Sequence, residues 1–180
     1  MLTKDNRFNI IHISDTHVCQ KKLTDLVRIK NALISDIKKH FSEKEISSSI
    51  VCFTGDLIQR GDYGFENERQ YGLIEDNLIL PLIEELGIDL KKFFIVPGNH
   101  EIDKSKIDPI YQKGLNEELR EYNGELNFNY KASPLHERFE GYKKFIESLS
   151  QSYSDEIVST EKIVVNNQKL GVCLINTSWT

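Results

Sequence analysis

The sequence predicts an α/β fold whose first sheet is largely parallel. Three short apolar runs, residues 8–13, 50–53 and 93–96, are rich in β-branched and aromatic side chains, which is typical of strands covered on both faces. Helical patterns separate the runs, and a short polar motif follows each run directly. Parallel strands joined by helices end at the same edge of a sheet, so we expect the three motifs to meet in one crevice.

Length and composition are those of one soluble domain over residues 1–180. The chain has 180 residues, 39% of them hydrophobic, which is enough to bury a core. Residues 1–9 show no signal-peptide pattern and no window is long enough to cross a membrane, so we expect a cytoplasmic protein without a membrane partner. The three cysteines lack paired metal-ligand spacing and are expected to be reduced. The net charge of −5, with dispersed lysines, shows no basic stripe for non-specific nucleic-acid binding.

Two helical patterns link the three apolar runs. The first is expected to begin at Thr24 as N-cap, and spacings of three and four mark one buried face: Leu26, Ile29, Leu33, Ile37 and Phe41. The second covers residues 66–86, where Pro81 is expected to kink or split the helix and Gly87 to end it. Its expected buried side consists of Tyr71, Ile74, Leu78, Leu82 and Leu86.

The chain changes character after the third motif. Residues 103–154 are polar and are interpreted as a helical insertion over or beside the crevice, with helices near 113–122 and 135–149. Residues 161–165 and 170–175 flank Asn166-Asn167-Gln168-Lys169, which predicts a β-hairpin that opens a second, more antiparallel sheet. The chain then ends in a polar loop, the pattern expected of a truncated domain with a further C-terminal half.

The residues that carry chemistry lie in the motifs Asp15-Thr16-His17, Gly55-Asp56 and Gly98-Asn99-His100. In an extended segment Asp15 and His17 point the same way, so both can face one ion. Asp56 offers a second carboxylate able to bridge two cations, and Asn99 offers a carbonyl oxygen. Mixed oxygen and imidazole donors favour manganese, iron or zinc. Each residue alone is better explained as a turn cap or a core histidine, whereas together they favour a metal site.

These motifs resemble the signature of the calcineurin-like metallophosphoesterases: Asp-x-His, then Gly-Asp, then Gly-Asn-His. The matching stretches, with their flanking residues, are 13–17, 53–56 and 96–101. The resemblance implies an αββα sandwich with two divalent ions, manganese first among them. It also implies that Asp15 and His17 hold one ion, Asp56 bridges both, Asn99 holds the second, and His100 contacts the phosphate or protonates the leaving oxygen.

Two departures from the family pattern bear on function. The family supplies later histidines, one alone and two in Gly-His-x-His, but this chain has no histidine after His136, so its ion site is incomplete as written. Arg60 resembles a phosphate-binding arginine of the protein-phosphatase branch, yet Gln59 stands where that branch has Asp. Phosphodiester substrates, such as a nucleotide or nucleic acid, are therefore expected ahead of phosphoproteins.

The expected reaction is hydrolysis by a hydroxide held between two ions that are bridged by Asp56, attacking phosphorus in line. A different class of function stays open at this point. The chain can instead be a non-catalytic scaffold of the same fold that binds a partner protein, and the presence or absence of a downstream Gly-His-x-His separates the two.

Overall fold

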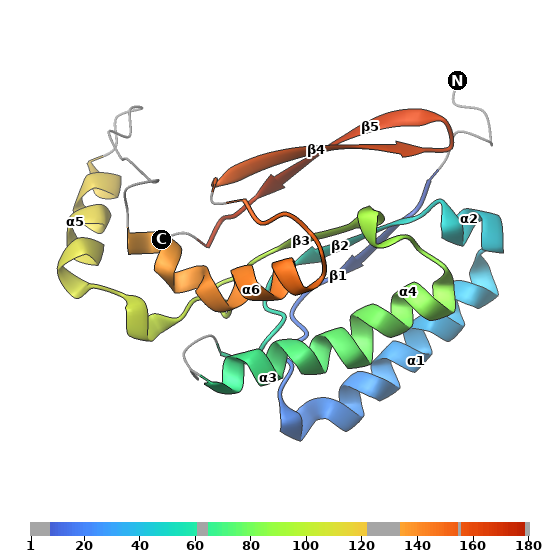
Figure 1. Cartoon of the computed structure of the whole chain (residues 1–180), viewed down its shortest axis with the longest axis horizontal. Helices are drawn as coiled ribbons and strands as arrows, with labels where there is room; N and C mark the ends of the chain where they lie inside the picture. Colours follow the sequence, from blue (N-terminus) through green and yellow to red (C-terminus); the bar gives the residue numbers. More distant parts are fainter. Residues whose placement is uncertain (1–7, 61–64, 122–133, 155, 179–180) are drawn as a thin grey trace.

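A three-stranded parallel sheet forms the centre of the computed structural model, which describes residues 8–60, 65–121, 134–154 and 156–178. The strands are β1 (Ile10–Ile13), β2 (Ile50–Thr54) and β3 (Phe93–Val96), in the order β1-β2-β3. Ile13 lies beside Phe53, and Thr54 lies beside Val96. The predicted α/β class with a parallel first sheet is confirmed, and all three strands end at the same edge (Figure 1).

Helices cover one face of this sheet (Figure 1). The connection from β1 to β2 contains α1 (Leu23–His40) and the short α2 (Glu43–Ser47). The connection from β2 to β3 contains α3 (Phe65–Ile74), a π-helical turn (Glu75–Ile79) and α4 (Leu80–Leu86). Side chains from alternate strand positions, such as Val51 and Phe53, point into the core that these helices complete.

The predicted start and buried face of α1 are partly wrong. The helix begins at Leu23 after Lys22, which makes no side-chain cap, so Thr24 lies inside the first turn. Leu26 and Ile37 are buried as expected, whereas Ile29 is 65% exposed and Phe41 lies beyond the helix end. Ile34 belongs to the buried face instead, because the row that contacts the core runs through positions 26, 34 and 37.

The second connection follows its predicted pattern closely. Every residue of its expected apolar side is buried: Tyr71, Ile74, Leu78, Leu82 and Leu86. The helix is divided as expected near Pro81, where the π-helical turn precedes α4, since proline has no N–H to continue the ladder. Gly87 ends α4 in the left-handed conformation with φ of 64°, and its N–H donates to Ile83 O at 2.9 Å.

The predicted hairpin forms and packs on the other face of the parallel sheet, over β2 and β3 (Figure 1). Its strands are β4 (Val158–Val165) and β5 (Gln168–Ile175), which are longer than the sequence pattern indicated. Asn166 and Asn167 form the turn with φ of 50° and 62°, the left-handed pair that a two-residue hairpin requires. Val165 packs with Ile50 and Phe94 between the two sheets.

All three strands of the parallel sheet were expected to be covered on both faces, and this expectation is wrong for β1. Strands β2 and β3 are largely buried, but Ile10 is 59% exposed and His12 is also exposed. The reason is the position of the hairpin, which contacts β3 through β5 and leaves the hairpin side of β1 open among the described residues.

Two further helices occupy the region between β3 and β4, namely α5 (Pro109–Arg120) and α6 (Glu140–Ser148). The 3-10 helix Pro134–Phe139 leads into α6, so both predicted helices exist with shifted bounds. Tyr142 Oη donates to Ile95 O at 2.9 Å, and Gln151 Nε2 donates to Phe93 O at 3.0 Å. These two side chains therefore satisfy carbonyls on the outer edge of β3.

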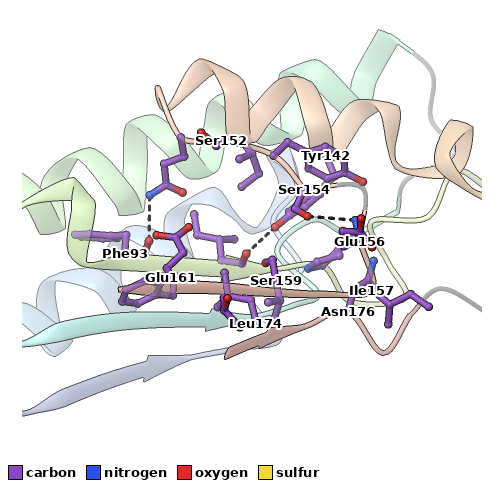
Figure 2. Close-up of a pocket in the computed structure, with 18 residues that line it drawn as sticks. Phe93, Tyr142, Ser152, Ser154, Glu156, Ile157, Ser159, Glu161, Leu174 and Asn176 are labelled. Atoms are coloured by element: carbon purple, nitrogen blue, oxygen red, sulfur yellow. Dashed lines mark hydrogen bonds between the residues drawn. The ribbon is translucent and has the colours of Figure 1, made fainter. Parts of the chain in front are cut away.

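A pocket of about 250 Å³ lies where β3, the segment after α6 and the hairpin meet (Figure 2). Its wall includes Phe93, Tyr142 and Leu174, and the backbone N–H of Glu156 donates to Ser154 Oγ at 3.2 Å there. None of the motif residues at 15–17, 55–56 or 98–100 lines it. The pocket therefore belongs to the junction of the layers and not to the site described next.

Candidate metal centre

The first two motif loops run side by side beyond the ends of β1 and β2. The backbone N–H of Asp15 donates to Gly55 O at 3.2 Å, that of His17 to Asp56 O at 2.9 Å, and that of Val18 to Leu57 O at 2.8 Å. Parallel pairing thus continues past the strands into the loops. This pairing holds Asp15 and His17 against Asp56, although about forty residues separate them in the sequence.

The backbone of these loops is left-handed at the donor residues. Asp15, His17 and Asp56 have φ of 55°, 42° and 54°. Residues 15–17 are therefore not the extended segment with alternating side chains that the sequence analysis assumed. The two side chains still meet, because His17 Nε2 lies 3.8 Å from Asp15 Oδ1, but the turn of the backbone brings them together and not strand alternation.

Two glycines allow the second and third loops to touch. A Cβ atom on Gly55 would lie 2.6 Å from Gly98 Cα, and one on Gly98 would lie 2.2 Å from Asp56 Oδ1. Gly55 also has φ of 97°, a conformation that glycine adopts readily. Gly98 is required for the close approach of Asp56 to the loop.

Three potential donor side chains converge at this edge of the sheet. Ligand atoms of His17, Asp56 and His100 all lie within 4.8 Å of one another, and the imidazole centroids of His17 and His100 are 4.4 Å apart. Asp15 lies next to this group, because its carboxylate is close to the His17 imidazole. Asn99 shares the lining of one open pocket with Asp15 and Asp56. All five residues singled out from the sequence thus gather at one place, with His100 nearer to the donor group than its expected role required.

His100 is oriented by the second loop. Its Nδ1 lies 2.5 Å from Gln59 O, and a carbonyl only accepts, so Nδ1 carries the proton and Nε2 is the nitrogen left for a ligand or substrate. Its backbone N–H donates to Asp56 Oδ1 at 3.1 Å. The imidazole is therefore held by residues of the Asp56 loop at both its ring and its backbone.

Glu101 is the residue of this site that sequence reasoning did not assign. Its carboxylate is 2% exposed and accepts four backbone hydrogen bonds. Oε2 accepts from Asp56 N at 2.9 Å and Gly98 N at 2.6 Å, while Oε1 accepts from Leu57 N at 2.7 Å and Ile58 N at 3.2 Å. The available signal was an acidic residue placed directly after the third motif and before an apolar residue.

The electrostatic state of Glu101 reflects opposing influences. Burial raises the pKa of its carboxyl above the ordinary value, and the nearby charge of Asp56 acts in the same direction. Hydrogen bonds from the backbone of Gly98, Ile58 and Asp56 lower that pKa. The net pKa shift is upward, because removal of the charge from water outweighs the donated hydrogen bonds.

The donor set fits a divalent transition metal. Nδ1 of His17 is buried and makes no hydrogen bond to any residue that the structure describes, and imidazole nitrogens are common metal ligands. Carboxylate oxygens of Asp15 and Asp56 supply the negative charge that a cation requires, and the absence of thiolates from the group agrees with a metal of intermediate hardness.

The remaining sequence candidates lie around this centre. His12 Nε2 is 2.7 Å from Thr54 Oγ1 on the exposed face of β1 and β2, which places it near the pocket that Thr54 lines. Arg60 is exposed, and its backbone carbonyl accepts from Gln70 Nε2 at 3.2 Å. The cysteines are free thiols, as expected.

A comparison with protein families agrees with this arrangement of motifs. A family model described as calcineurin-like phosphoesterase matches residues 8–169, which is most of the chain. The chain belongs to the calcineurin-like phosphoesterase family. No curated protein and no solved structure matched in the corresponding searches.

The calcineurin-like phosphoesterases are metal-dependent hydrolases that act on phosphoesters. The substrate of this chain therefore contains phosphate. The matched range spans all three motif loops and reaches the first residues of β5. Among the described residues no helix combines the length and apolar character needed to cross a bilayer.

Proposed function

We propose that the chain is a phosphodiesterase that acts on a nucleotide or nucleic acid and uses two divalent ions, manganese foremost. The observation that carries the proposal is the convergence of His17, Asp56 and His100 within 4.8 Å at the ends of the parallel strands. Asp15 and Asn99 extend the donor set on the side of the open pocket. Iron and zinc also suit these donors.

The protein ligands divide between the two ions. Asp15 and His17, which lie side by side, would hold one ion; Asn99 would hold the other, and Asp56 would bridge both. Bound ions of this kind lower the pKa of a water molecule and neutralise negative charge on phosphoryl oxygens. Glu101 fixes the Asp56 backbone, so the bridging carboxylate is oriented before any ion binds.

His100 is the residue proposed to face the substrate. Because the carbonyl of Gln59 holds the proton on Nδ1, Nε2 is directed elsewhere; only the imidazolium form, in which Nε2 also carries a proton, can donate to a phosphoryl oxygen or deliver that proton to the leaving oxygen. Protonation of the leaving oxygen matters most for esters of poorly acidic alcohols, since these alkoxides leave slowly without a proton.

The test compares the wild-type chain with Asp56→Asn in manganese, with bis(4-nitrophenyl) phosphate and 4-nitrophenyl phosphate as substrates. The wild type is expected to hydrolyse the diester faster and to lose activity in excess chelator. Asp56→Asn removes the bridging charge and should reduce turnover by at least about a hundredfold, in line with the loss of an essential electrostatic group.

Asn tolerates the left-handed backbone at position 56, so Asp56→Asn is expected to fold. The matched control is Asp36→Asn, the same change at an exposed position of α1, where metal-dependent activity should not change. Near-normal, metal-dependent rates in Asp56→Asn would refute the proposed site, and faster hydrolysis of the monoester would refute the phosphodiester preference.

A further inference from the structure

The chain at and after the end of β5 lines the same pocket as the metal-centre residues. This pocket, of about 320 Å³, is lined by the candidate donor residues Asp15, Asp56 and Asn99. Its lining also includes Ile175, the last residue of β5, and Thr177 and Ser178 just after it. The segment that follows the hairpin, here called the wall, therefore contributes to a site whose donor residues follow the parallel strands.

This wall is a built turn anchored to the hairpin. Asn176 is buried, its backbone N–H donates to Ile157 O at 2.8 Å, and its side-chain Oδ1 accepts from Ser178 N at 2.9 Å. Such a turn between residues 176 and 178 fixes the direction of the backbone next to the pocket. The hydroxyls of Thr177 and Ser178 make no hydrogen bond within the described part of the chain.

The chemistry of the pocket is asymmetric. Its carboxylates are Asp15 and Asp56, whose charge bound cations would neutralise, and no lysine or arginine is among the described residues that line it. What remains for the rest of a substrate is neutral: hydroxyls at positions 54, 177 and 178, and apolar surface from Val96, Pro97 and Ile175. A second phosphate or an acidic peptide would find no cationic partner on this wall.

We propose that Thr177 and Ser178 form a specificity-determining wall that binds the neutral alcohol portion of the substrate, of the nucleoside type. The inference rests on the proposed function, since it assigns the group that is esterified to the phosphate at that same centre. Hydroxyl groups bind the hydroxyls and carbonyls of a nucleoside, and the apolar surface contacts its base.

The experiment measures binding to the manganese-loaded full chain by titration calorimetry, with thymidine 5′-monophosphate and inorganic phosphate as the two probes. The wild type is expected to bind the nucleotide more tightly than phosphate. Thr177→Val and Ser178→Ala should each weaken nucleotide binding by about three- to tenfold, the effect of one lost hydrogen bond, and leave phosphate binding unchanged.

The matched control is Thr160→Val, the same substitution at an exposed position of β4 that does not line this pocket, and it should change neither affinity. If the variants lose equal affinity for both probes, or lose no affinity for the nucleotide, the proposed role of the wall is wrong while the proposed function stands. A wild-type chain that binds phosphate but gains nothing from the nucleoside would do the same. If manganese and both probes fail to bind, the proposed function fails and the wall with it.

Discussion

The carboxylate of Glu101 accepts a 2.9 Å hydrogen bond from the backbone N–H of Asp56, 45 residues earlier in the chain. The same carboxylate holds Gly98 of the third loop. One buried side chain therefore joins two of the three loops that supply metal donors. The geometry of the candidate metal centre therefore depends on Glu101, which is not itself proposed as a ligand.

Glu101→Gln is expected to weaken manganese binding by about ten- to a hundredfold, the usual effect of disturbing a group that orients metal ligands. The amide retains the volume of the carboxyl but has one acceptor oxygen for four N–H donors. Titration calorimetry with manganese measures the effect, and circular dichroism confirms that the variant is folded.

Glu84→Gln is the control for this change, because Glu84 is exposed on α4 and removed from the loops. Its manganese affinity should equal that of the wild type. Unchanged affinity in folded Glu101→Gln would show that the loops keep their positions without this carboxylate.

Gly98→Ala is expected to disrupt the site and destabilise the fold, since the added Cβ would lie 2.2 Å from Asp56 Oδ1 and 2.5 Å from Asp56 N.

Gly114→Ala is expected to have the opposite effect on stability. Gly114 lies inside α5 with no atom near its Cβ position, so alanine should stabilise the chain by about 0.5–1 kcal/mol. Urea unfolding measures both, and a neutral Gly98→Ala would contradict the close approach of the two loops.

The two buried tyrosines next to Glu101 should respond differently to loss of the hydroxyl. Tyr142 Oη donates to Ile95 O, so Tyr142→Phe is expected to cost about 1 kcal/mol of unfolding free energy. Tyr71 Oη is buried without a partner in the described part of the chain, so Tyr71→Phe should be neutral or stabilising. Equal destabilisation by both, seen in denaturant unfolding, would mean that Tyr71 also has a hydrogen bond.

Stability should fall in alkaline solution. Burial raises the pKa of Tyr71 and of Tyr142 well above the ordinary value, and the charge of Glu101 adds to both shifts. Well below pH 10 both tyrosines are neutral in the folded and unfolded chains. As the pH rises through 10 only the unfolded chain ionises them, so the loss of unfolding free energy steepens toward about 1.4 kcal/mol per pH unit for each tyrosine. The double phenylalanine variant should lose stability less steeply between pH 10 and 11, and an identical slope would contradict the shifts.

Local patterns in the sequence were sufficient for the strands and for the second helical connection. Parallel strands buried between two layers are continuous apolar runs, and β2 and β3 follow that rule. The side running through Tyr71, Leu78 and Leu86 kept its period even across the π-helical turn. Asn166 and Asn167 predicted the hairpin because few residues tolerate two successive left-handed conformations.

Features set by tertiary packing were not accessible in the same way. Ile29 fits the helical period of α1 but is exposed, because α4 and the π-helical turn contact a different row of that helix. Ile10 reads as a core strand residue, yet the hairpin lies over β3 and leaves it exposed. Neither outcome follows from the spacing of apolar residues, since this spacing does not determine which helix or strand packs against each position.

The motifs showed which residues are candidate metal donors, but they did not show why these residues lie close together in the fold. Asp15 and His17 meet through a turn and not through strand alternation. Glu101 and the wall at Thr177 and Ser178 act across 40 residues or more, through backbone hydrogen bonds and through the second layer. Such relationships depend on which loops face each other, and only the folded chain reveals that.

The left-handed backbone at Asp15, His17 and Asp56 implies a conflict between thermal stability and the proposed chemistry of these residues. Each such conformation costs a side chain other than glycine about 1–2 kcal/mol, and asparagine or glycine would relieve part of it. Substitutions that raise the thermal stability of the chain are therefore expected at the same positions that are proposed to hold the ions. Aspartate and histidine at these strained positions are therefore explained by the proposed chemistry of the centre and not by backbone stability.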